Sequence, residues 1–132
     1  MKRYARTLNL KDDPAVIQRY VDYHRRVWPE VERGLRAIGI EGMLIWRLGR
    51  RLFMLMDTAD GFDPERDFAR YMDSDPCIRE WQALMETFQE PVSEAQPGEW
   101  WADMELVYAL TPPTRPRPGT RSARARRDGS RR

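Results

Sequence analysis

The chain has 132 residues, 41% of them hydrophobic, which is enough for one hydrophobic core and too few for two domains of usual size. Residues 112–132 carry eight arginines and one aspartate, a balance of +7, so the formal net charge of +2 leaves about −5 on residues 1–111. The basic character therefore belongs to the last residues and gives no reason to expect nucleic-acid binding by the rest.

The first predicted element is a strand over residues 3–10. Tyr4, Leu8 and Leu10 fall on one face of an extended chain, and positions 5, 7 and 9 fall on the other. This spacing of two residues is typical of a strand with one buried face.

A long amphipathic helix is predicted over residues 14–38. Asp13 and Pro14 form an N-cap followed by a proline in the first helical position, and apolar residues then recur at helical spacing. Pro29 lies inside this stretch, where a proline removes a helical hydrogen bond, so we expect a kink or short break at residues 26–28. Gly39 is expected to end the helix as its C-terminal cap.

Two strand-like runs follow, over residues 42–48 and 51–57. Only Gly49 and Arg50 separate them, which predicts a hairpin. Every residue from Leu52 to Met56 is apolar. The second strand is therefore expected to be covered on both faces.

The rest of the folded part is predicted to contain two helices and a last strand. Asp63-Pro64 and Asp75-Pro76 repeat the pattern of a capping aspartate before a proline, and apolar residues follow each pair at helical spacing. After a loop at residues 90–99, the segment WWADMELVYAL alternates Met104, Leu106, Tyr108 and Leu110 with the residues between them. We expect this segment to form the fourth strand.

The resulting order of elements, βαββαβ, predicts an α+β fold of the ferredoxin-like type, with an antiparallel sheet covered by helices on one face. The other sheet face needs a cover, and a second copy of the chain would provide it, so we expect a homodimer. Residues 1–111 form the single predicted domain. Residues 112–132 contain almost no large apolar residue, and we expect this Arg/Pro-rich tail to be disordered.

Cys77 and His24 are the only cysteine and the only histidine of the chain. One cysteine allows no intrachain disulfide and favours a reducing compartment, so we expect a cytoplasmic protein. Two such ligands are too few for a structural zinc site. The N-terminal residues lack the apolar run of a signal peptide, and no run approaches the length of a transmembrane helix.

Tyr20, His24 and Trp28 are spaced by four residues, so on a continuous helix they share one face. They could be an aromatic part of the core. An imidazole on an apolar face, however, must satisfy both ring nitrogens, and at neutral pH it can give or take a proton. From the residues alone, a core stripe and an acid/base site remain equally open.

Residues 24–30, HRRVWPE, preceded by Tyr20 and followed by Gly39, resemble the L-rhamnose mutarotase family, whose members include L-fucose mutarotases. The resemblance extends through the apolar strand RLFMLM and the helix DPCIREWQALM to the strand MELVYAL, about residues 2–110. It implies a dimeric α+β barrel that interconverts the α and β anomers of a 6-deoxy-L-hexose. Such an isomerase of carbohydrate metabolism binds a monosaccharide and needs no cofactor.

The resemblance implies that His24 occupies the position of the family's catalytic proton donor and that Tyr20 occupies the position of a sugar-binding tyrosine. A second sugar-binding tyrosine of the rhamnose enzymes falls on Met43, and a tryptophan pair falls on Glu80 and Trp81. These departures are expected of the branch that resembles L-fucose mutarotases. Trp28 completes the candidate substrate-binding residues.

Four glutamate and tryptophan positions have alternative interpretations. Glu80 could accept hydrogen bonds from sugar hydroxyls, act as a partner base, or be a solvated helix residue. Trp81 could present an apolar face to the sugar, belong to the core between helix and sheet, or do both. Trp100 and Trp101 are expected at the rim or in a dimer contact.

Two other functions fit the same predicted fold. One is a small cofactor-free oxygenase of the antibiotic-biosynthesis type, against which the set of Tyr20, His24 and the WPE motif argues. The other is a binding module related to RNA-recognition domains. Residues 50–57 lack the glycine and aromatic alternation of an RNA-stacking strand, so we expect no specific nucleic-acid partner.

Overall fold

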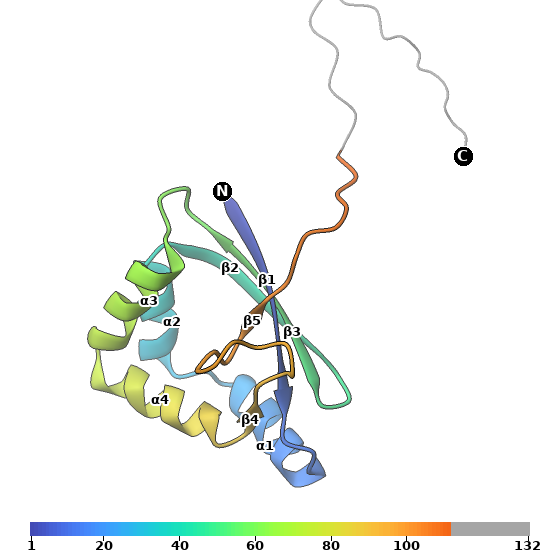
Figure 1. Cartoon of the computed structure of the whole chain (residues 1–132). Helices are drawn as coiled ribbons and strands as arrows, with labels where there is room; N and C mark the ends of the chain where they lie inside the picture. Colours follow the sequence, from blue (N-terminus) through green and yellow to red (C-terminus); the bar gives the residue numbers. More distant parts are fainter. Residues whose placement is uncertain (112–132) are drawn as a thin grey trace, which may run out of the picture.

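The computed structural model describes residues 1–111. Its elements, shown in Figure 1, are β1 (Lys2–Leu10), α1 (Pro14–His24), α2 (Pro29–Ala37), β2 (Ile40–Leu48), β3 (Arg51–Thr58), α3 (Pro64–Asp73), α4 (Pro76–Glu86), β4 (Gln89–Glu90) and β5 (Ala102–Asp103). None of the helices in this part of the chain has the length and apolar character needed to cross a membrane. The predicted Arg/Pro-rich tail, 112–132, lies outside the described residues.

The strands form one antiparallel sheet in the order β2-β3-β1-β4, and β5 also pairs with β1. The four helices gather on one side of this sheet (Figure 1). Leu8, Leu10, Leu52 and Met56, which come from β1 and β3, are completely or almost completely buried. The α+β fold and the ferredoxin-like order predicted from the sequence are therefore confirmed.

Each predicted aspartate-proline pair starts a helix. The side chains of Asp13, Asp63 and Asp75 accept hydrogen bonds from backbone N–H groups in the first turns of α1, α3 and α4. A proline follows directly in each case. Its missing N–H costs no helical hydrogen bond there, because the first N–H groups of a helix have no partner within the helix.

The predicted break in the long helix lies at residues 25–28. α1 ends at His24, and α2 begins at Pro29 with Trp28 as its N-cap residue. Pro29 thus occupies a first helical position, in which its missing N–H does no harm. Gly39 follows α2 with a φ of +102°, a left-handed conformation that favours glycine.

β2 and β3 form the predicted hairpin, with Leu48 opposite Arg51 and Gly49 in the turn at a φ of +61°. Residues directly opposite each other share a sheet face. The face toward the helices carries Met43, Ile45, Met54 and Met56, whereas the outer face carries the apolar residues Leu44, Trp46, Phe53 and Leu55. Leu44 and Trp46 are more than half exposed.

The predicted last strand over residues 100–110 is wrong in extent. Only Ala102 and Asp103 pair with β1, and the final hydrogen bond joins the Met104 N–H to the Ala5 carbonyl. Beyond this point the chain leaves the sheet (Figure 1), and Leu106, Tyr108 and Leu110 are at least 73% exposed. Alternation predicts an extended backbone, but a strand also needs a hydrogen-bonding neighbour.

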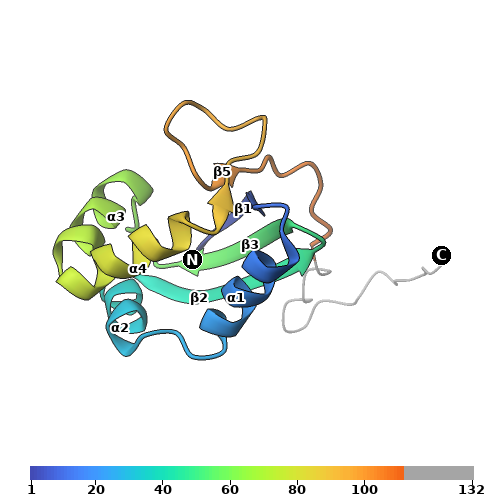
Figure 2. The ribbon, with the colours of Figure 1, turned by 90° about the horizontal axis from the view of Figure 1, so that it is seen from below.

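A two-residue strand that the sequence did not indicate, β4, also pairs with β1. β4 and β5 occupy successive parts of the same β1 edge, since β4 lies opposite Asn9 and Leu10, and β5 lies opposite Arg6 and Thr7. The loop of residues 91–101 connects them and projects beyond this edge (Figure 2). The fourth strand of the fold is therefore interrupted by a loop.

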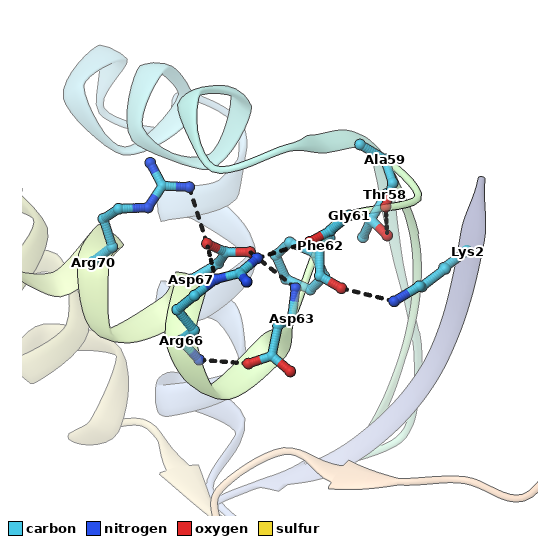
Figure 3. Close-up of polar contacts among 9 residues, drawn as sticks. All are labelled: Lys2, Thr58, Ala59, Gly61, Phe62, Asp63, Arg66, Asp67 and Arg70. Carbon is cyan, nitrogen blue, oxygen red and sulfur yellow. Dashed lines mark hydrogen bonds and ion pairs between the residues drawn. The ribbon is translucent and has the colours of Figure 1, made fainter.

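The start of α3 is held by a buried carboxylate, that of Asp67 (Figure 3). Asp67 is 2% exposed and accepts hydrogen bonds from the Asp63 N–H at 2.9 Å and from the guanidinium groups of Arg66 and Arg70. Arg66 also donates to the Gly61 carbonyl, 2.7 Å away. These contacts fix the connection between β3 and α3.

Candidate functional site

A cavity of about 790 Å³ lies between the helices and the inner face of the sheet. Four of the six candidate residues line it: Tyr20 and His24 from α1, Met43 from β2, and Trp81 from α4. Residues that are distant in the sequence therefore line the same cavity, as they do in most binding sites.

His24 is the last residue of α1, directly before the helix break. Its Nδ1–H donates a hydrogen bond to the backbone carbonyl of Tyr20, with 2.9 Å between nitrogen and oxygen. A carbonyl only accepts, so this contact places the proton of a neutral ring on Nδ1 and leaves a lone pair on Nε2.

Burial lowers the pKa of His24 below its ordinary value of 6.5, and the hydrogen bond to the Tyr20 carbonyl opposes part of that change. Burial acts in this direction because it disfavours the charged imidazolium. At neutral pH the ring is therefore uncharged and Nε2 can accept a proton.

Aromatic rings surround the imidazole. The Tyr20 ring lies with its centroid 4.3 Å from that of His24, and the Trp81 ring meets His24 edge-to-face at 5.6 Å. Trp28 is not among the residues that line the cavity and packs against Trp81, with ring centroids 5.1 Å apart. Trp28 therefore supports the cavity wall, and Trp81 belongs both to the wall and to the core.

Tyr20 is only 3% exposed. Burial raises the pKa of its hydroxyl to about 12, and a hydrogen bond with the Gln89 side chain opposes that rise. The hydroxyl is thus uncharged throughout the neutral range. It can orient a ligand as a hydrogen-bonding group and cannot act as a base there.

Glu80 lies away from the cavity. Its side chain is exposed on α4, and it is absent from the cavity lining. The neighbouring position, Trp81, points inward instead, because successive helical residues are about 100° apart. The carboxylates that line the cavity are Glu32, Glu41 and Glu86.

Other lining residues escaped the sequence analysis. Arg6 reaches the cavity from β1, where it shares the inner face with Tyr4 and Leu8, so the period of two could have identified it. Gln89 lies in β4, an element that no pattern predicted. Trp100 and Trp101, expected at the rim or in a dimer contact, line the cavity through the loop before β5.

The cavity therefore combines apolar and aromatic walls with an uncharged imidazole, an uncharged phenol and charged side chains of both signs. Such a lining can hold a small organic ligand that carries several hydroxyl groups. Among residues 1–111, no group of three or more histidine, cysteine, aspartate or glutamate side chains is placed to hold a metal ion.

Comparison with known proteins gives a family match over residues 3–110, to the family described as L-rhamnose mutarotase. A UPF0734 protein of Dictyostelium discoideum is 45% identical over 112 residues, which are 83% of this chain and 90% of that protein. The L-fucose mutarotase of Xanthomonas campestris pv. campestris is 41% identical over 113 residues, 84% of this chain and 90% of that protein.

Two solved structures share the fold. The L-rhamnose mutarotase of Formosa agariphila matches with a TM-score of 0.60 at 18% identity, over 84% of this chain and 100% of that chain. The tetracenomycin F2 cyclase of Streptomyces glaucescens matches with a TM-score of 0.54 at 19% identity, over 86% of this chain and 100% of that chain. At such identities these likenesses concern the fold alone.

Proposed function

Because the chain belongs to the L-rhamnose mutarotase family, we propose that it interconverts the α and β anomers of L-fucose, with His24 as the acid/base group. It is an aldose mutarotase, an isomerase of 6-deoxy-L-hexoses. L-Fucose is chosen over L-rhamnose because the relative described as an L-fucose mutarotase is 41% identical over most of both chains. The other interpretations, a cofactor-free oxygenase and a binding module, are less well supported.

The observation that carries the proposal is the state of the imidazole. His24 lines the cavity with Nδ1–H bound to the Tyr20 carbonyl, so its Nε2 lone pair is available to a ligand. Tyr20 and Trp81 flank the ring and supply a hydroxyl and an aromatic face for the sugar. Met43 forms part of the apolar wall.

The reaction needs one proton to move between two oxygens of the sugar. Nε2 of His24 takes the proton of the anomeric hydroxyl, and the resulting imidazolium gives it to the ring oxygen as the bond from C1 to that oxygen breaks. Both oxygens are bonded to C1, so one nitrogen can serve both. Rotation about the C1–C2 bond and the reverse sequence give the other anomer, with no net change in protons.

The Tyr20 carbonyl assists this sequence in both directions. Its hydrogen bond to Nδ1–H holds the ring in one tautomer, and it also stabilises the imidazolium that forms between the two proton transfers. Free sugars already change anomer slowly in water. A rate acceleration of about 10²- to 10⁴-fold, which general acid/base catalysis typically provides, is therefore sufficient.

The test is anomeric exchange measured by saturation-difference NMR on L-fucose and L-rhamnose at equilibrium and neutral pH. Wild type is expected to accelerate exchange, and to accelerate it more for L-fucose than for L-rhamnose. His24→Ala is expected to reduce the rate of the catalysed exchange by a factor of about 10² to 10⁴. His24→Ala retaining full activity would remove His24 from the mechanism. No acceleration of either sugar by wild type would overturn the proposed function.

We also propose that the protein is a homodimer formed through the outer face of the sheet. Leu44, Trp46, Phe53 and Leu55 make this face apolar, and no element among residues 1–111 covers it. Segment 104–110 also exposes apolar side chains, those of Met104, Leu106, Val107, Tyr108 and Leu110. A twofold axis would place the same face of two copies against each other.

A cytoplasmic location is the last part of the proposal. It is supported by Cys77, the only cysteine of the sequence, which allows no intrachain disulfide. Fractionation of the source cells with an antibody to the protein would test the location.

A further inference from the structure

Gln89 is a buried residue of the cavity wall that the proposed mechanism does not use. Its side chain is 5% exposed, and its Oε1 is buried without a hydrogen-bond partner among the described residues. Buried polar atoms nearly always have a partner, so an unpaired one in a residue that lines a cavity calls for an explanation.

The backbone holds this side chain in place. Gln89 lies in β4 opposite Leu10 of β1, and the Lys11 N–H donates to the Phe88 carbonyl at 2.9 Å. Opposite residues of an antiparallel pair point to the same face, and Leu10 is completely buried beneath the helices. The Gln89 amide is therefore directed to the inner side of the sheet.

One end of the amide already has a partner. A hydrogen bond joins the side chains of Gln89 and Tyr20 and lowers the pKa of the Tyr20 hydroxyl. Because Oε1 has no hydrogen-bond partner among the described residues, this contact involves the amide nitrogen, which can only donate. This leaves the carbonyl oxygen, Oε1, as the free half of the amide.

Gln89 consequently lies next to the proposed acid/base group, since the ring centroids of Tyr20 and His24 are 4.3 Å apart. We propose that Gln89 binds the sugar directly: its Oε1 accepts a hydrogen bond from one hydroxyl of the substrate, while its nitrogen holds Tyr20. This inference rests on the proposed function and adds a substrate-binding residue to it.

The chemistry of the cavity favours this role. A sugar hydroxyl donates one hydrogen bond and needs an acceptor. Gln89 and the carboxylates of Glu32, Glu41 and Glu86 bring acceptor oxygens to the cavity lining, whereas the Arg6 guanidinium only donates. The carbonyl oxygen of Gln89 is neutral and accepts a hydrogen bond without a change of charge. A sugar hydroxyl bound at Gln89 would give Oε1 the hydrogen-bond partner that it lacks among the described residues.

The test compares Gln89→Met with wild type by calorimetric titration with L-fucose. Gln89→Met keeps the length of the side chain and removes the amide, and we expect the dissociation constant to rise about tenfold, as for loss of one buried hydrogen bond. Gln18→Met makes the same chemical change on the exposed side of α1 and should bind like wild type. If Gln89→Met does not fold, Gln89→Asn replaces it.

Analogues of L-fucose that each lack one hydroxyl identify the contact. Wild type should bind the analogue that lacks the contacted hydroxyl about tenfold more weakly than L-fucose, and for that analogue Gln89→Met should cause no further loss. An equal loss in Gln89→Met for every analogue would overturn a direct contact.

The same substitution in a Tyr20→Phe background separates sugar binding from support of Tyr20. A contact with the sugar predicts that Gln89→Met still weakens binding there, whereas a purely positioning role predicts no further effect. Unchanged L-fucose binding by Gln89→Met overturns the inference and leaves the mutarotase function intact. Absence of both binding and exchange in wild type overturns the two together.

Discussion

At the scale of single residues, the site depends on a histidine that its surroundings keep uncharged. Burial lowers the pKa of His24, and the Tyr20 carbonyl fixes the tautomer that leaves Nε2 free. A base works only while it is unprotonated. The lowered pKa therefore leaves His24 able to accept a proton at pH values at which an ordinary imidazole would already be protonated.

We expect kcat/KM for anomeric exchange to be constant at neutral pH and to fall only at a pH below 6.5, the ordinary pKa of histidine. The His24 ring signals should titrate with the same midpoint in NMR spectra of the free enzyme. The lowered pKa also makes the protein lose stability as the pH falls below 6.5, because the unfolded chain then binds more protons. A midpoint at or above 6.5 would contradict the assignment.

Glu80 gives a second test at this scale. Because its side chain is exposed and lies outside the cavity lining, Glu80→Gln should leave the exchange rate and the preference between L-fucose and L-rhamnose within about twofold of wild type, as for most surface substitutions. A loss of tenfold or more, or a reversed preference, would restore Glu80 to the site. The NMR exchange assay measures both quantities.

At the scale of an element, α3 depends on the buried carboxylate of Asp67. The guanidinium groups of Arg66 and Arg70, together with the Asp63 N–H, hold the pKa of Asp67 well below its ordinary value of 3.8. The charged form is thus favoured in the folded protein, and the same contacts anchor the connection from β3. This anchor fixes α3, which contributes Phe68, Tyr71 and Met72 to the cavity wall.

We expect Asp67→Asn to lower the midpoint of thermal unfolding at pH 7. A carboxyl with a depressed folded pKa stabilises the protein above its unfolded pKa, and that stabilisation is lost as the pH falls below about 3.8. The difference between variant and wild type should therefore shrink in acid. Asp73→Asn, which removes an exposed partner of Arg79, is the control and should have little effect. Equal midpoints at pH 7 would show that Asp67 is dispensable.

At the scale of the whole molecule, the sheet has one face covered by helices and one apolar face open. Trp46 and Phe53 stack on the open face with ring centroids 5.5 Å apart, and Trp46 remains 51% exposed. An apolar face of this kind favours association. The sequence prediction that β3 is covered on both faces requires a second chain.

Light scattering after gel filtration should give twice the chain mass of 15.7 kDa for wild type. Trp46→Glu should give a monomer, because it would bury an unpaired charge between two apolar faces. Ala69→Glu, on the exposed side of α3, is the matched control and should remain dimeric. A wild type that is monomeric at micromolar concentration would contradict the proposed homodimer.

The sequence by itself determined the elements whose signals are local. An aspartate before a proline favours the start of a helix, and all three such pairs of this chain start one, so Asp13, Asp63 and Asp75 could be identified from the sequence alone. Pro29 broke the long helix because a proline has no N–H to donate. The spacing of Tyr20 and His24 likewise placed both side chains on one face, and the cavity contains both.

Only the tertiary structure decided which residues share the cavity and how far the last strand extends. Glu80 and Trp81 are neighbours in the sequence, but the packing of α4 turns one outward and the other inward. Gln89 reaches Tyr20 because a two-residue strand pairs with β1. Residues 104–110 have the alternation of a strand, yet pairing to β1 ends at Met104, because a strand needs a neighbour that no local pattern supplies.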